Sequence, residues 1–239
     1  MTTTATTWLH RCGFALFPGV CLLCGRASGR ALDLCAACDA ALPRIASACR
    51  RCALPLPVPG ICGRCQRRPP PFEASLAPCH HAPPVDGMIQ RLKYGGDLAQ
   101  AAPLAALIAA RARLRNTPLP EALVPVPLHW RRQVARGFNQ ALELALPLGR
   151  TLGIPVRDRL VRRLRATPPQ VGLSRAQRHR NLTRAFAVAA ASEALPRHLA
   201  LVDDVITTGS TVEAVAGCLR RAGVERIEIW AVSRAGLAN

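Results

Sequence analysis

The segment that most constrains the fold of this chain is Leu199–Thr211, with the sequence LALVDDVITTGST. Four apolar residues, enough for a short buried strand, lead directly into Asp203 and Asp204. Two more apolar residues precede a hydroxyl-rich turn around Gly209, and apolar residues then recur at helical spacing. Another apolar run, at 227–232, follows. This order predicts a strand–loop–helix–strand unit.

The turn in this unit has the chemistry of a phosphate site. Gly209 lets the backbone approach a ligand closely, and the N-terminus of the following helix presents unpaired N–H groups with partial positive charge. Hydroxyl donors without bulk surround it: Thr207, Thr208, Ser210 and Thr211. The two aspartates repel phosphate but accept hydrogen bonds from sugar hydroxyls, or hold magnesium through water. The segment therefore predicts a site for a ribose 5-phosphate group.

An ordinary strand end with an acidic turn is the alternative interpretation, and the Gly-Lys-Ser/Thr of the Walker phosphate loop is missing. The segment resembles the 5-phosphoribosyl-1-pyrophosphate (PRPP) motif of type I phosphoribosyltransferases. That resemblance implies PRPP and Mg²⁺ as ligands, with Asp203 and Asp204 as catalytic acids. It also implies a PRPP-binding set: Val205, Ile206, Thr207, Thr208, Gly209, Ser210 and Thr211.

Eight of the 11 cysteines form four Cys-x-x-Cys pairs: Cys21/Cys24, Cys35/Cys38, Cys49/Cys52 and Cys62/Cys65. A two-residue gap lets both thiolates of a turn face one tetrahedral zinc ion, and four thiolates complete a structural site. Disulfides are disfavoured without a secretion signal, and a redox centre needs only one pair. The pattern predicts two structural Zn²⁺ ions. Sequential and cross-braced pairing of the four turns both fit the spacing.

The formal charge of +18 comes almost entirely from arginine, since Lys93 is the only lysine. Such a balance predicts a polyanionic partner or an anionic substrate, although a genome of high GC content also favours arginine codons. Residues 1–20 are expected to form a helical segment that is too short to span a membrane. With no cleavage site after it, the chain is expected to be cytoplasmic.

Prolines at 69–71 are typical of stiff, extended chain. They predict a boundary between a double zinc ribbon at 21–70 and an α/β domain at 71–239. Within the second domain we expect helices at 85–93, 98–114 and 137–152, and strands ending near 126 and spanning 156–163.

Seven arginines and no acidic residue occur between Arg162 and Arg184. A cationic, turn-rich segment of this kind predicts a lid over pyrophosphate or a DNA-binding surface. A solvated basic surface is the alternative. The residues assigned to this role are Arg165, Gln170, Arg175, Arg178 and Arg180.

Further motifs extend the resemblance along the chain. In order they are the cysteine pairs, Lys93-Tyr94, Val124–His129, Arg131-Arg132, Arg136–Gln140, Thr167–Gln170 and the PRPP motif. Together they resemble the competence protein F (ComF) family over nearly the whole chain. The resemblance implies a zinc-ribbon head on a type I phosphoribosyltransferase domain with a Rossmann-like parallel sheet. It adds four residues to the PRPP site: Lys93, Pro127, Arg131 and Arg132.

The family resemblance also implies a role in DNA uptake. A DNA-uptake helicase or an inner-membrane channel would then be a partner, and the protein would lie at most peripherally on the inner membrane. Two functions compete at this stage. The chain either binds PRPP and single-stranded DNA, or it transfers the phosphoribosyl group to a base in nucleotide salvage and releases pyrophosphate.

Overall fold

The computed structural model describes residues 19–128, 134, 136–164, 185–189 and 194–236. The chain divides into two compact units, 1–42 and 43–239. The smaller unit contains the short helix α2 (Ala36–Ala40), and most of the expected N-terminal helical segment lies outside the described residues. Within the described ranges, no helix has the length and apolar character needed to cross a bilayer.

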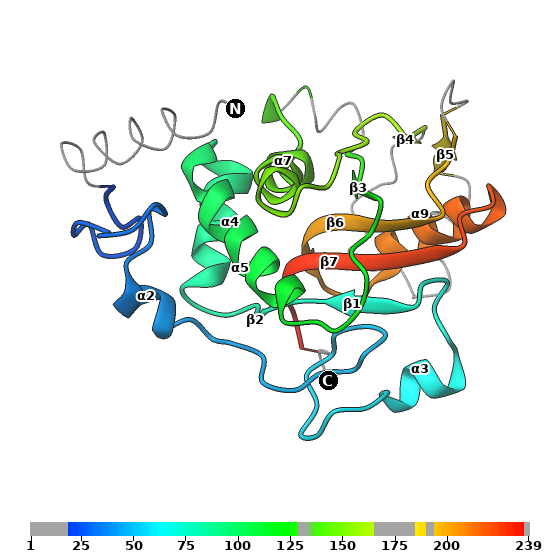
Figure 1. Ribbon diagram of the computed structural model, residues 1–239, viewed down its shortest axis with the longest axis horizontal. Coiled ribbons are helices and arrows are strands. Elements are labelled where there is room, and N and C mark those ends of the chain that lie inside the picture. Colours follow the sequence, from blue (N-terminus) through cyan, green and yellow to red (C-terminus); the bar gives the residue numbers. More distant parts are fainter. Residues whose placement is uncertain (1–18, 129–133, 135, 165–184, 190–193, 237–239) are drawn as a thin grey trace, which may run out of the picture. The chain divides into compact units, whose positions relative to one another are not determined.

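The larger unit is built on a five-stranded parallel sheet (Figure 1). Strands β6 (His198–Ile206) and β7 (Arg226–Arg234) form its centre. The other edge of β6 pairs with β3 (Ala122–Pro125), and β7 pairs in turn with β1 (Ala74–Leu76) and β2 (Cys79–His80). The expected α/β class with a parallel sheet is therefore confirmed.

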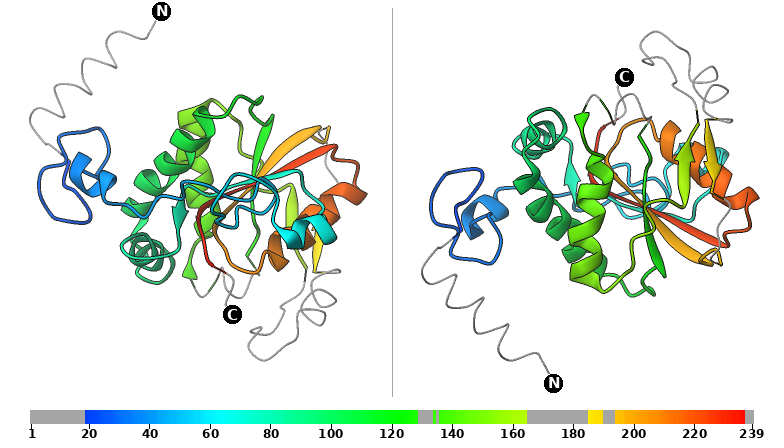
Figure 2. Two further views of the ribbon diagram at one scale, coloured as in Figure 1. Left: turned by 90° about the horizontal axis from the view of Figure 1, so that it is seen from below. Right: turned by 90° about the horizontal axis from the view of Figure 1, so that it is seen from above.

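Helices cover both faces of this sheet. Figure 2 shows α5 (Ala101–Arg113) and α7 (Gln140–Leu152) on one face and α9 (Ser210–Arg221) on the other. Helix α4 (Val85–Tyr94) and the short 3₁₀ helix η1 (Leu98–Gln100) precede α5. Because a parallel sheet is buried on both faces, its strands read as continuous apolar runs rather than alternating ones.

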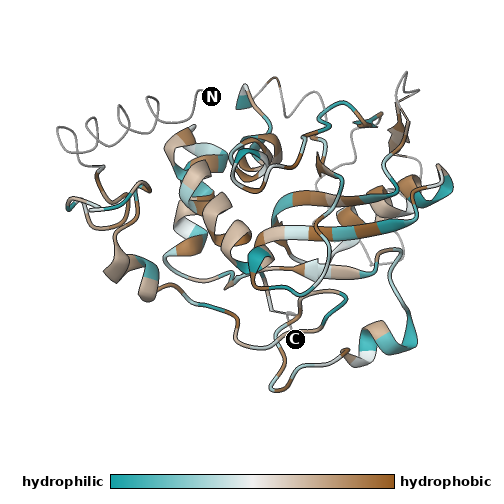
Figure 3. Cartoon of the chain, viewed as in Figure 1, coloured by the Kyte–Doolittle hydropathy of each residue, from teal (hydrophilic) through white to brown (hydrophobic). Residues whose placement is uncertain are grey.

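Both central strands carry hydrophobic stretches (Figure 3). The side chains of 199–202 in β6 and of 229–232 in β7 are all fully buried. Against one face pack Val212, Val215 and Leu219, the apolar residues that gave α9 its helical spacing. This packing fixes β6 in the middle of the domain, so the residues that follow it emerge at the carboxyl edge of the sheet.

Two element boundaries differ from the sequence-based expectation. Helix α7 begins at Gln140 rather than near 137, because the Asn139 side chain accepts a hydrogen bond from the Ala141 N–H (3.0 Å) and caps the helix. The single strand expected over 156–163 is wrong. Val156 forms one parallel bridge to the main sheet, a turn follows at 158–159, and the chain then enters a separate hairpin.

That hairpin consists of β4 (Val161–Arg163) and β5 (Phe186–Val188), which pair antiparallel. The two strands bracket the arginine-rich segment. A three-residue strand carries too little periodicity to distinguish a hairpin from a sheet strand, so the sequence alone did not separate the two.

The second cysteine-rich ribbon lies against the β1–β2 edge of the sheet. The Ser75 N–H donates to the carbonyl of Arg50 (3.0 Å), and the Ile45 N–H donates to the carbonyl of Pro78 (2.9 Å). Covering an edge strand in this way satisfies its backbone groups. This ribbon therefore belongs to the larger compact unit. The domain boundary near residue 70 stays a prediction.

A buried cluster of charged side chains surrounds Glu228, near the amino end of β7. Glu228 is fully buried, and Arg115 donates to both of its carboxylate oxygens (2.5 and 2.9 Å). The side chains of Arg226 and Trp230 donate to the same group (2.9 and 3.0 Å). Burial raises the pKa of Glu228, but these donors outweigh it and lower the pKa from 4.5 to about 2.

Replacing Glu228 with glutamine should lower the free energy of unfolding at neutral pH by about 3 kcal/mol, the equivalent of this pKa difference. A carboxyl whose pKa falls on folding stabilises the fold above its unfolded pKa. The difference between the variant and the wild type should therefore close as the pH drops from 4.5 toward 2. Urea denaturation at several pH values measures it. Glu225→Gln is the control, because it removes only a surface ion pair with Arg197 and should change the free energy of unfolding little. Equal losses of unfolding free energy in the two variants would contradict the prediction.

Candidate phosphate-binding and metal sites

The loop between β6 and α9 has the backbone geometry that an anion site needs. Gly209 adopts the left-handed conformation (φ +83°) directly before α9 and has no side chain to cap the helix. The Thr208 and Ser210 hydroxyls hydrogen-bond each other (2.9 Å). The 12-residue helix therefore begins at a glycine that is flanked by two hydroxyls, a combination that suits a phosphate.

The two aspartates stand at the carboxyl end of β6 beside this loop. Each carboxylate accepts a hydrogen bond from the following backbone N–H group. The Asp204 N–H donates to Asp203 Oδ1 (2.9 Å), and the Val205 N–H donates to Asp204 Oδ1 (2.8 Å). Lys93, from the last turn of α4, places its Nζ 2.5 Å from Asp204 Oδ2. The only lysine of the chain therefore lies in the same site as the acid pair.

The surroundings of Asp203 disfavour its charged form. Burial and the neighbouring Asp204 carboxylate raise the pKa of Asp203 well above its usual value, and Lys93 opposes this only in part. A carboxyl held in this way gains from any ligand that donates hydrogen bonds or positive charge to it. Sugar hydroxyls and a hydrated divalent cation both do so.

Two arginines donate hydrogen bonds to backbone carbonyls of the β6–α9 loop. Arg234, at the end of β7, is fully buried and donates to the carbonyls of Ile206 (2.9 Å) and Thr207 and, through Nε, to that of Cys52 (3.0 Å). Arg64 of α3 (Gly63–Arg67) donates to the carbonyl of Thr208 (3.1 Å). Since Cys52 and Arg64 belong to the second ribbon, this ribbon is joined by hydrogen bonds to the loop.

The cysteines form two groups of four, Cys21/Cys24/Cys35/Cys38 and Cys49/Cys52/Cys62/Cys65, each with all Sγ atoms within 4.8 Å. Pairing is therefore sequential, and the cross-braced alternative is excluded. Across the pairs, Cys24 and Cys35 lie 3.9 Å apart, and Cys52 and Cys62 lie 3.7 Å apart. A tetrahedral zinc ion with Zn–S bonds of about 2.3 Å requires about 3.8 Å between sulfurs. Both groups fit structural zinc.

Comparison with known proteins agrees with this arrangement. Residues 14–66 match the double zinc ribbon domain model. The chain is 41% identical to "Competence protein F" of Haemophilus influenzae over 179 residues, which cover 73% of this chain and 78% of that protein. It is 36% identical to "DNA utilization protein YhgH" of Salmonella typhi and of Escherichia coli K12, over 98% of this chain and 99% of each relative.

The chain belongs to the competence protein F family.

Among the site residues expected for this ComF-family protein, the structure brings Lys93, the two aspartates and the turn around Gly209 together. The side chain of Ile206 is buried in the core, so only its backbone could face a ligand. Pro127 directly follows Val126, whose N–H donates to the Val202 carbonyl of β6 (2.9 Å). The remaining expected residues lie outside the described part of the chain: Arg131, Arg132, Arg165, Gln170, Arg175, Arg178 and Arg180.

Sequence reasoning misses Arg64 and Arg234. Arg234 leaves a signal, because a charged residue follows the apolar run 229–232 closely, at the carboxyl end of β7. Arg64 leaves none, because an arginine inside a Cys-x-x-Cys turn of so basic a chain looks like any surface cation. Both act on backbone carbonyls of a loop that is remote in sequence, which only the folded chain brings near them.

Proposed function

We propose that this ComF-family protein binds PRPP at the β6–α9 loop and single-stranded DNA on its basic surface, in the service of DNA uptake. The observation that carries the PRPP assignment is the combination of a helix N-terminus whose N-cap residue, Gly209, has no side chain to cap it, with the acid pair at the end of β6. The helix N-terminus receives the 5-phosphate, and the carboxylates receive the ribose hydroxyls. In this proposal the domain is of the type I phosphoribosyltransferase kind.

Lys93 and Mg²⁺ have complementary roles in this proposal. PRPP carries a pyrophosphate group on the ribose, and Mg²⁺ bound with it would neutralise part of that charge close to the carboxylates. The ammonium of Lys93, now paired with Asp204, would turn to the incoming pyrophosphate. Removal of that cation from Asp204 leaves the carboxylate free to accept from a sugar hydroxyl.

The proposed DNA binding rests on the positive net charge and on the names of the related proteins. A net charge of +18 favours a polyanionic partner, and the relatives carry the names "Competence protein F" and "DNA utilization protein YhgH". The arginine-rich segment between β4 and β5 would contribute to this surface or close over pyrophosphate. A DNA-uptake helicase or inner-membrane channel as partner stays a prediction.

The decisive test of the PRPP site is ligand-dependent stability. PRPP with Mg²⁺ at a hundred times its dissociation constant should stabilise the fold by about 2.7 kcal/mol. The double variant Asp203→Asn/Asp204→Asn should lose this stabilisation, because amides no longer offer charged acceptors to the ribose and the magnesium. Thermal denaturation with and without ligand measures the effect. Asp158→Asn, which changes a half-exposed carboxylate beside Arg159, is the control and should respond like the wild type.

A wild-type protein whose melting temperature is unchanged by millimolar PRPP would contradict the proposal. The competing function, phosphoribosyl transfer in nucleotide salvage, is tested in the same preparation. Release of pyrophosphate from PRPP with one member of a panel of bases would replace the binding function by an enzymatic one.

A further inference from the structure

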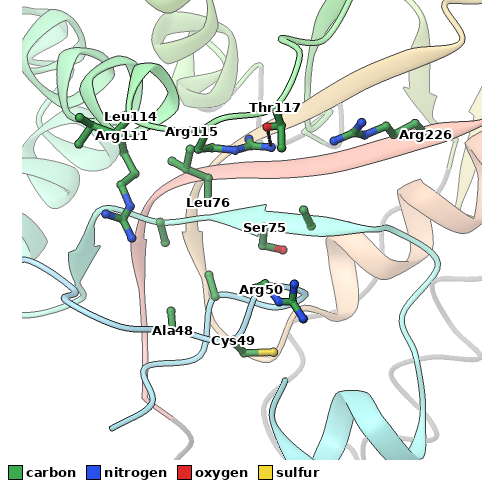
Figure 4. A pocket seen from close by; sticks show the side chains of 13 residues that line it. Ala48, Cys49, Arg50, Ser75, Leu76, Arg111, Leu114, Arg115, Thr117 and Arg226 are labelled. Atoms are coloured by element: carbon green, nitrogen blue, oxygen red, sulfur yellow. Dashed lines mark hydrogen bonds between the residues drawn. The ribbon is translucent and has the colours of Figure 1, made fainter. Parts of the chain in front are cut away.

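A concave site lies away from the β6–α9 loop. A cavity of about 390 Å³ opens between the second ribbon, β1 and the end of α5 (Figure 4). It reaches Arg226 at the amino end of β7, whereas the phosphate loop follows the carboxyl end of β6. A cavity of this size is within the range that holds small-molecule ligands.

The lining of this cavity is positively charged. Four arginines and no acidic residue line it: Arg50, Arg111, Arg115 and Arg226. Arg115 and Arg226 are already bound to the buried Glu228. Arg50 and Arg111 are exposed and have no acidic partner in the described part of the chain. Figure 4 shows Arg111 extending from α5, with Arg50 below β1. These two guanidinium groups are free to bind an anion.

Apart from the hydroxyls of Ser75 and Thr117 and the thiol of Cys49, the rest of the lining is apolar. Aliphatic side chains of the ribbon and of β1 form one wall of the cavity, among them Ala48, Ala53 and Leu76. At the rim stands Leu114, which directly follows α5 and is 79% exposed. An apolar wall beside unpaired guanidinium groups is complementary to a ligand with a flat hydrophobic ring and a phosphate. Arginine matches phosphate oxygens with two parallel hydrogen bonds.

We propose that this cavity binds one nucleotide unit, with its base against the alanine and leucine wall and its phosphate between Arg50 and Arg111. This inference extends the proposed DNA-binding function. It rests on that function for the claim that the bound nucleotide is part of a single DNA strand. A free nucleotide and a nucleotide within a single strand share this chemistry. Single-strand sites combine backbone cations with platforms for the bases, and here aliphatic side chains form the platform.

The test compares two double variants with equal charge changes. Arg50→Gln/Arg111→Gln removes the free cations of the cavity. Arg150→Gln/Arg221→Gln is the matched control, since both residues are exposed, lie in the last turns of α7 and α9, and are not part of the cavity. Fluorescence anisotropy with labelled oligodeoxythymidine gives the dissociation constant over a series of salt concentrations.

The cavity variant should bind the oligonucleotide about tenfold more weakly, and its log–log salt slope should be shallower by about 0.7, since the two arginines together hold one phosphate and each neutralised phosphate accounts for about 0.7. The control variant should follow the wild type. Leu114→Ala, at a position too exposed to matter for the core, should weaken binding a few-fold without changing the slope. Both cavity variants should keep their PRPP-dependent stabilisation, which separates this site from the phosphate loop.

Equal weakening in the cavity variant and the control would overturn the proposal, because binding would then be spread over the basic surface. If the wild type binds no single-stranded DNA, the DNA part of the proposed function fails. Calorimetric titration with thymidine 5′-monophosphate then tests whether the cavity binds a free nucleotide. Binding that Arg50→Gln/Arg111→Gln abolishes supports a free nucleotide as ligand, and no binding in the wild type overturns the cavity as a nucleotide site.

Discussion

Replacing Cys52 and Cys65 with serine will remove one zinc ion and abolish the cooperative unfolding transition of the larger unit. All four cysteines of the second group are buried, with exposures of 1% to 7%. Structural zinc sites of this kind contribute about 10–16 kcal/mol of binding free energy to folding. The second ribbon also covers the sheet edge and anchors Arg234, so its loss exposes β1 and releases the loop. Elemental analysis and thermal denaturation measure the two effects.

The matched control for this variant is Cys21→Ser/Cys38→Ser. These ligands belong to the smaller compact unit. The control should also lose one zinc ion, but the melting transition of the larger unit and its response to PRPP should remain. A wild-type protein without zinc would contradict the assignment of both metal sites. Equal destabilisation by the two double variants would contradict the different structural roles of the two ribbons.

Replacing Arg234 with methionine should destabilise the fold by at least about 3 kcal/mol, because it leaves several buried carbonyl groups without their charged donor. Those carbonyls belong to Cys52, Ile206, Thr207 and Ala235. Two of them lie in or beside the phosphate loop, so PRPP affinity should fall as well. Arg234→Lys keeps the charge but not the planar fork, and should recover only part of both losses.

Urea denaturation and PRPP titration of the folded fraction separate stability from loop positioning. Arg221→Met removes an exposed arginine from the last turn of α9 and should alter neither quantity. If Arg234→Met lost stability while its PRPP affinity equalled that of the wild type, Arg234 would support the fold but not position the loop.

The sequence by itself determined the elements whose signals are local. The apolar run of β6, the acid pair, the glycine turn and the helical spacing of α9 are consecutive, so the strand–loop–helix unit could be predicted with its left-handed glycine turn. The Cys-x-x-Cys spacing likewise predicted two four-cysteine groups. In the strand–loop–helix unit and within each Cys-x-x-Cys pair, the interacting residues are near neighbours in the chain, and the local backbone conformation is enough to bring them together.

Only the tertiary structure decided the interactions between distant segments. Spacing allowed two pairings of the cysteine turns, and the Sγ positions select the sequential one. No pattern links Lys93 to Asp204, Arg234 to the Cys52 carbonyl, or Arg115 to Glu228. The first two contacts form at the carboxyl ends of the parallel strands, where α4 and the second ribbon approach β6 and β7, whereas the third forms near the amino end of β7. Burial then makes each unpaired charge or carbonyl costly, so the folded chain supplies partners that no local periodicity predicts.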